Sequence, residues 1–132
     1  MEWSAELYAH AIAVEREAAR RYAELAWRMT EQGSEEAARL FAEFAALQAV
    51  HLAALCRRNE GSAPADLTSD HSWPEGSDPL ARALQAERDA RAFFAQARRV
   101  APDPAARALA DEMTVEESGH IERLESLIAK KA

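Results

Sequence analysis

Hydrophobic residues recur every three or four positions along four segments of this chain, which is the spacing of one face of a helix. Asp78 and Asp103 are each followed by a proline, a pair that favours the first turn of a helix. The segment from Glu31 to Ser34 is expected to end the first helix and to cap the second. We therefore expect helices over about residues 4–30, 35–59, 79–100 and 104–130.

The connections between these segments predict the topology. The first and second helices, and the third and fourth, are joined by a few residues, so each pair is expected to form an antiparallel hairpin. The loop 61–77 has 17 residues, which when extended span roughly 56–61 Å, more than the about 37 Å of a 25-residue helix. We expect an all-α fold in a single domain, residues 1–132: an antiparallel four-helix bundle of two hairpins joined by this one long crossover loop.

The net charge, the single cysteine and the lack of a long apolar run exclude several classes of function and location. The net charge of −7 argues against nucleic acid as a partner, because phosphate binding needs a basic surface. The single cysteine, Cys56, excludes a disulfide framework and is expected to be a small core residue. The longest uninterrupted apolar run is the five residues from Leu52 to Cys56. We therefore expect no signal peptide, no membrane span and, by default, a cytoplasmic location.

Charged and polar residues interrupt the hydrophobic face of every expected helix. A carboxylate on a buried face is costly unless something compensates it, and a metal ion inside a bundle is a common compensation. The four faces read Leu7, Ala11, Glu15, Ala18, Tyr22, Leu25 and Met29; Leu40, Phe44, Leu47 or Gln48, His51 and Leu55; Leu80, Leu84, Glu87, Arg91 and Phe94; and Leu109, Met113, Glu117, His120, Leu124 and Leu127.

These polar positions have the spacing of metal ligands. Glu117 precedes His120 by three residues, which places both on one helix face, and Gln48 precedes His51 by the same interval. Glu15 and Glu87 lie on the preceding helices, each followed seven residues later by an aromatic residue, Tyr22 and Phe94. This repetition indicates an internal duplication of helical hairpins. Carboxylate and imidazole donors suit ferrous, manganous or zinc ions.

Each residue also has a simpler interpretation. A Glu-x-x-His match in an acidic helical protein is common by chance. His51 could be a core histidine, and Glu15 could pair with Arg91 or lie, like Glu87, at the edge of its face and reach solvent. His10 and His71 lack the context of a ligand and are expected to be solvated.

The stretch from Ala11 to Ala26 closely resembles the first helix of the rubrerythrin-like branch of the ferritin-like superfamily. The remaining helices resemble theirs over 41–55, over 82–94 and around Glu117-x-x-His120. The resemblance implies a ferritin-like bundle in which Glu15, His51, Glu87, Glu117 and His120 bind metal, with Gln48 where the family has glutamate. It further implies a homodimer that binds two iron ions and reduces peroxide, or oxidises ferrous iron with oxygen or peroxide. Tyr22 could hydrogen-bond a ligating carboxylate in the second shell.

Two departures from the family pattern change this picture. With one cysteine the chain lacks the rubredoxin-type iron site of rubrerythrins, so electrons would come from an external donor protein or from ferrous iron itself. Gln48 is neutral, so Glu15, Glu87 and Glu117 leave one positive charge on two divalent ions. A single ion or an asymmetric pair is therefore a second expectation. Alternatives are a non-catalytic bundle with a decayed metal site that acts as a binding protein, and a small-molecule carrier with an apolar pocket.

Overall fold

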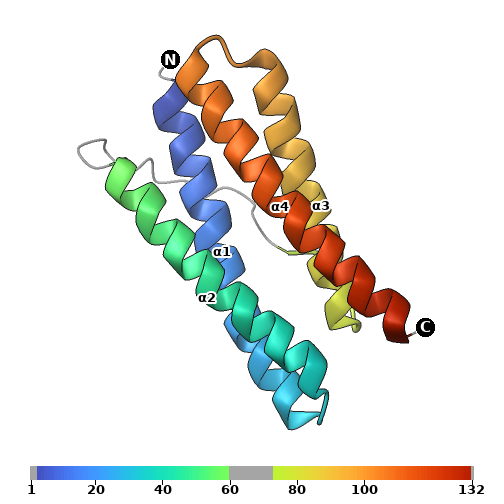
Figure 1. Cartoon of the computed structure of the whole chain (residues 1–132). Coiled ribbons are helices and arrows are strands. Elements are labelled where there is room, and N and C mark those ends of the chain that lie inside the picture. Colours follow the sequence, from blue (N-terminus) through green and yellow to red (C-terminus); the bar gives the residue numbers. More distant parts are fainter. Residues whose placement is uncertain (1–2, 60–72, 132) are drawn as a thin grey trace. The chain divides into compact units, whose positions relative to one another are not determined.

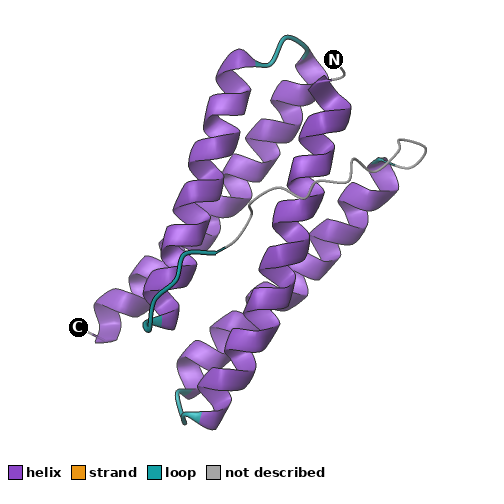
Figure 2. Cartoon of the chain, turned by 180° about the vertical axis from the view of Figure 1, so that it is seen from behind, coloured by secondary structure: helices purple, strands orange, loops and turns teal. Residues whose placement is uncertain are grey.

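The protein is described by a computed structural model over residues 3–59 and 73–131 of its 132 residues. Its helices are α1 (Trp3–Glu31), α2 (Glu35–Arg58), α3 (Pro79–Val100) and α4 (Pro104–Lys131) (Figure 1). Each bound lies within one residue of the expected one. The described ranges contain no strand (Figure 2), and the all-α fold class expected from the sequence is confirmed.

The described residues form two compact units, each built on a helical hairpin. One unit contains α2 and α1 from Ala9 onwards, and the other contains α3, α4 and the start of α1 up to Tyr8. In the second unit the Ser4 hydroxyl donates a hydrogen bond of 3.1 Å to Oδ1 of Asp103. Residues 61–72 of the expected crossover loop lie outside the described residues. The crossover and the single-domain organisation therefore stay predictions.

The α1–α2 turn is a Schellman motif, in which the backbone itself satisfies the last carbonyls of α1. Gly33 has φ +76°, its amide donates to the Thr30 carbonyl (3.1 Å), and the Ser34 amide donates to the Met29 carbonyl (2.9 Å). Ser34 is the N-cap residue of α2, but its side chain makes no capping hydrogen bond. The backbone of Ser34 is held by the end of α1 at φ −88° and ψ 74°, away from the extended conformation typical of a capping residue.

Aspartates cap the two later helices as the sequence predicts. Oδ1 of Asp78 accepts hydrogen bonds from the Leu80 amide (3.1 Å) and the Ala81 amide (3.4 Å). Oδ1 of Asp103 accepts a 2.7 Å bond from the Ala106 amide. These caps satisfy amides that have no partner within the helix, and so fix where α3 and α4 begin.

The hydrophobic faces are buried where the sequence places them. All seven expected positions of α1 and all six of α4 are buried, whereas Leu84 and Arg91 of α3 are partly exposed. Of the two alternatives on α2, Gln48 occupies the buried face and is 3% exposed. Leu47 is 47% exposed. The expectation that Cys56 is a core residue is wrong: it follows buried Leu55 on the helix and is exposed.

Among the described helices, α2 is long and apolar enough to cross a membrane. This is weak evidence, because core helices of soluble proteins meet the same criteria of length and composition. Only 28% of its most apolar stretch is buried, so much of the apolar surface of α2 is exposed.

Candidate metal centre

The α3–α4 hairpin buries a carboxylate against a histidine. Nδ1 of His120 lies 3.1 Å from Oε2 of Glu87, within hydrogen-bond distance, and the side chains are 7% and 5% exposed. Glu87 follows buried Ala83 by one turn of α3, and His120 follows Glu117 by three residues on the buried face of α4. The hydrophobic periodicity of the two helices therefore directs both polar groups into the hairpin.

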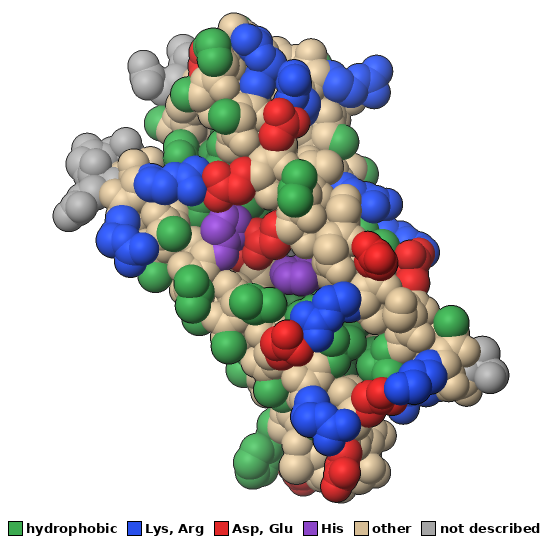
Figure 3. All heavy atoms as spheres, in the orientation of Figure 1, with side chains coloured by type: hydrophobic (Ala, Val, Ile, Leu, Met, Phe, Trp, Pro, Cys, Tyr) green, Lys and Arg blue, Asp and Glu red, His purple; other side chains and the backbone are tan. Residues whose placement is uncertain are grey.

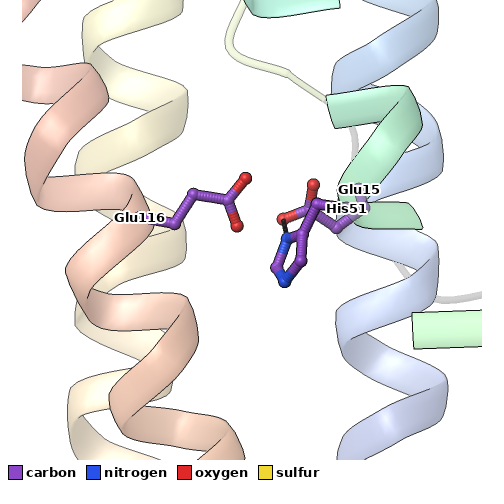
Figure 4. A group of neighbouring side chains, drawn as sticks. All are labelled: Glu15, His51 and Glu116. Carbon is purple, nitrogen blue, oxygen red and sulfur yellow. Dashed lines mark ion pairs between the residues drawn. The ribbon is translucent and has the colours of Figure 1, made fainter. Parts of the chain in front are cut away.

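The α1–α2 hairpin contains a pair of the same kind. Nδ1 of His51 lies 3.3 Å from Oε1 of Glu15, an ion pair marked by the dashed line in Figure 4. The Glu15 side chain is 1% exposed and that of His51 is 17% exposed. In both hairpins the first helix supplies the carboxylate and the second supplies the histidine. The repetition that led us to expect an internal duplication therefore extends to the contacts of these polar residues.

The spacing of these donor atoms fits metal binding. Two ligands that bind one ion at about 2.1 Å and at right angles to each other lie about 3 Å apart. The oxygen–nitrogen distances of 3.1 and 3.3 Å are close to that value. A carboxylate and an imidazole nitrogen are also the donor types that iron, manganese and zinc share. Each pair thus offers two ligands for an ion with little rearrangement.

Two further expected ligands share the buried faces of the second helices. Glu117 is 2% exposed and lies three residues before His120, and Gln48 is 3% exposed and lies three residues before His51. An ionised carboxylate that is buried to this degree is unusual in a purely structural core. All six expected ligands are therefore turned away from solvent, with His51 the most accessible of them.

Glu116 is a candidate ligand that the sequence reasoning did not include. It is partly buried, and its Oε2 atom is inaccessible to solvent. Figure 4 shows its side chain extending from α4. A signal was present, because Glu116 precedes His120 by four residues and this interval places two side chains on one helix face. The sequence analysis assigned the ligand of α4 to Glu117, which precedes His120 by three residues.

The structure bears on the interpretations in which these residues do not bind metal. Glu15 and Glu87 are both buried, so neither reaches solvent from the edge of its helix face. Nη1 of Arg91 donates a long hydrogen bond of 3.5 Å to the Ser118 hydroxyl within its own hairpin. His10 is partly buried on α1, and His71 lies outside the described residues.

Tyr22, whose hydroxyl is expected to hydrogen-bond a ligating carboxylate, is fully buried. Its ring stacks on that of Phe41 at a centroid distance of 5.8 Å and meets the edge of Phe44 at 5.2 Å. These contacts account for the ring of Tyr22 as part of the hydrophobic core. The proposed role of its hydroxyl toward a ligand stays a prediction.

Comparison with known proteins supports the all-α four-helix fold. No family model and no curated protein matches the sequence. The chain is similar to the crystal structure of an uncharacterized conserved protein from Magnetospirillum magnetotacticum MS-1, with a TM-score of 0.90 and 28% sequence identity. The match covers 96% of this chain and 93% of that one.

Proposed function

We propose that this protein is a ferritin-like, non-haem iron protein that oxidises ferrous iron or reduces peroxide. The observation that carries the proposal is the repeated pair: each hairpin buries one glutamate beside one histidine, at 3.1 Å and 3.3 Å. A single pair could be structural. The same pair at equivalent places in two hairpins, with another buried carboxylate in Glu117, is the ligand pattern of a carboxylate-bridged metal centre.

In this proposal Glu15, Glu87 and Glu117 neutralise the ions, and His51 and His120 complete their coordination. Gln48 contributes at most an amide oxygen. Glu116 would then supply the fourth carboxylate, which the family resemblance places at position 48. Four carboxylates cancel the charge of two divalent ions, whereas three leave one positive charge. This chain would thus replace a bridging ligand of α2 with one of α4.

The carboxylates and histidines of the chain would determine how ions are held and how an oxidant reaches them. The carboxylates would hold the ions, and the burial of Glu87 and Glu117, which are 4% and 2% exposed, would limit the access of water. Bound iron would supply one-electron chemistry with oxygen or peroxide. His51, the most accessible of the expected ligands, marks the side from which a small oxidant would enter.

A second candidate function is a non-catalytic bundle that binds one ion or none and acts through its surface. The buried amide Gln48 favours it, because a neutral side chain in place of a glutamate is what partial loss of a metal site would leave. The two functions differ in whether oxidation of added iron depends on the buried pairs.

The test is the rate of ferrous iron oxidation, followed by the absorbance of ferric product after mixing with oxygen or peroxide. We expect the wild-type protein to accelerate oxidation above the rate in buffer, and Glu87→Gln to lose most of the acceleration. Glu17→Gln is the matched control, because Glu17 is partly exposed and pairs with Arg20 and Arg21 within α1. Equal rates in all three proteins would favour the non-catalytic bundle.

A further inference from the structure

Each hairpin has a buried polar residue three positions before its histidine, and these two residues differ in charge. In α4 the residue is Glu117 and in α2 it is Gln48. The three-residue interval places each of them on the same helix face as its histidine, His120 or His51. An ionised carboxylate offers two charged acceptor oxygens, whereas an amide offers one neutral oxygen. The two hairpins are therefore unequal at equivalent positions.

This difference changes the charge that each hairpin presents to a divalent ion. The α3–α4 hairpin buries two carboxylates, Glu87 and Glu117, and the α1–α2 hairpin buries one, Glu15. The attraction between a cation and a carboxylate is stronger where water is excluded, so one carboxylate fewer lowers the affinity of the α1–α2 hairpin for the same ion. Glu116, the fourth carboxylate of the proposed centre, is also a residue of α4. The α1–α2 hairpin itself thus still contributes one.

The two hairpins also differ in the accessibility of their histidines. The side chain of His51 is 17% exposed and that of His120 is 7% exposed. Figure 3 shows histidine side chains at the surface of the molecule, in agreement with the partial exposure of His51. Access of solvent to a ligand assists the exchange of the ion that it binds, and burial of the ligand opposes it. The hairpin with fewer carboxylates is therefore also the one from which an ion leaves more readily.

We propose that the α3–α4 hairpin holds a resident iron ion, whereas the α1–α2 hairpin binds the ferrous ion that exchanges with solution. Gln48 is the residue that sets this difference. The inference rests on the proposed function, and it names the place where the iron substrate of that function enters. It also gives the order of loading, in which the first ferrous ion occupies the α3–α4 hairpin and the second occupies the α1–α2 hairpin.

A purely structural role is the alternative for Gln48. In that case the buried amide is part of the packing of α2 and does not influence iron. The substitution Gln48→Glu separates the two roles. A carboxylate at this position gives α2 the same ligand type as α4, so the proposal requires the α1–α2 hairpin to hold its ion more tightly. A structural role requires no change in the exchange of iron.

The test is the exchange of bound iron in the full chain under anaerobic conditions. The protein is loaded with two ferrous ions per chain and mixed with an excess of ferrous iron enriched in a heavier stable isotope. The isotopes that stay bound are measured by mass spectrometry at successive times, after rapid removal of the excess. We expect one ion per chain to exchange at least about tenfold faster than the other, because its hairpin has one carboxylate fewer.

Variants assign the two ions to their hairpins. His51→Ala should lose the fast ion and keep the slow one, and His120→Ala should lose the slow one. Gln48→Glu should slow the fast ion, whereas Gln96→Glu, which adds the same charge at an exposed position of α3, should change neither rate. Glu117→Gln makes α4 match α2 and should speed the slow ion. It keeps the shape of the side chain, so it replaces His120→Ala if circular dichroism shows that this variant does not fold.

The outcomes separate this inference from the proposed function. Equal exchange of both ions, loss of the slow ion in His51→Ala, or wild-type exchange in Gln48→Glu would overturn the inference and leave iron binding intact. A wild type that retains no iron would overturn the proposed function and the inference with it. Two ions with the expected rates, in a protein that does not accelerate iron oxidation, would support the inference and contradict the proposed redox chemistry.

Discussion

Nδ1 of His120 lies 3.1 Å from Oε2 of Glu87 inside the α3–α4 hairpin, and more than nine-tenths of each side chain is buried. Taking a carboxylate and an imidazole out of water costs free energy that their mutual attraction only partly offsets. A core of leucines at these two positions would avoid that cost. The pair is therefore better explained by what it binds than by what it contributes to stability.

The first prediction concerns the stability of the metal-free protein. Glu87→Leu and His120→Leu should each lower the free energy of unfolding by about 1–3 kcal/mol, because each leaves a buried polar group without its partner. The double variant Glu87→Leu/His120→Leu should recover wild-type stability or exceed it. Urea unfolding in the presence of a chelator measures all four proteins. A double variant less stable than either single variant would show that the pair is a structural element in its own right.

The second prediction concerns the charge of the metal centre. Glu116→Gln should weaken the binding of the second ferrous ion at least tenfold, because three carboxylates remain for two divalent ions. Adding Gln48→Glu to that variant should restore binding, since it returns a carboxylate to α2. Isothermal titration under anaerobic conditions gives both affinities. Gln96→Glu adds the same charge at an exposed position of α3 and should restore nothing; a rescue by Gln96→Glu would mean that net charge alone governs binding.

A third prediction concerns the cap of α4 and its contact with α1. Asp103→Ala should cost about 1–2 kcal/mol of unfolding free energy, because it removes the side-chain cap of α4. Ser4→Ala should cost less, and the two changes should be non-additive by about 0.5–1 kcal/mol, since the Ser4 hydroxyl donates to the same carboxylate. Chemical denaturation of the single and double variants measures the coupling. Full additivity would argue that the hydrogen bond contributes nothing to stability.

The fourth prediction separates the two roles of Tyr22. Tyr22→Phe keeps the ring that packs on Phe41 and Phe44, so the unfolding free energy of the metal-free protein should change by no more than about 1 kcal/mol. If the phenol orients a ligating carboxylate, iron affinity should fall about tenfold. Unchanged affinity would leave Tyr22 as a core residue only.

The fold was largely predictable because its determinants are local. Proline after an aspartate marks the start of α3 and of α4, and the three-to-four residue periodicity locates the buried faces. The capping role of Ser34 was not predictable in this way, because a competing backbone motif of Gly33 controls that turn. The burial of Cys56 was predicted wrongly. Cys56 follows Leu55, which occupies the buried face, and the next residue along a helix points away from that face.

The candidate site was predictable to the extent that it repeats. Glu15 with His51, and Glu87 with His120, could be paired because two hairpins carry the same pattern. Glu116 has no counterpart with the same spacing on α2, where position 47 is leucine and position 48 is glutamine. A ligand that breaks the internal symmetry leaves no repeat to detect, and it becomes visible from the burial of its carboxylate.

The measurement that tests the central claim most directly is iron stoichiometry by elemental analysis, after anaerobic loading with ferrous iron and removal of the excess. We predict two iron ions per chain in the wild type, and a loss of bound iron in His51→Ala and in His120→Ala. His10→Ala, a change elsewhere on α1, should bind as the wild type does. Retention of no iron by the wild type, or equal retention by all four proteins, would contradict the assignment of the buried pairs as metal ligands.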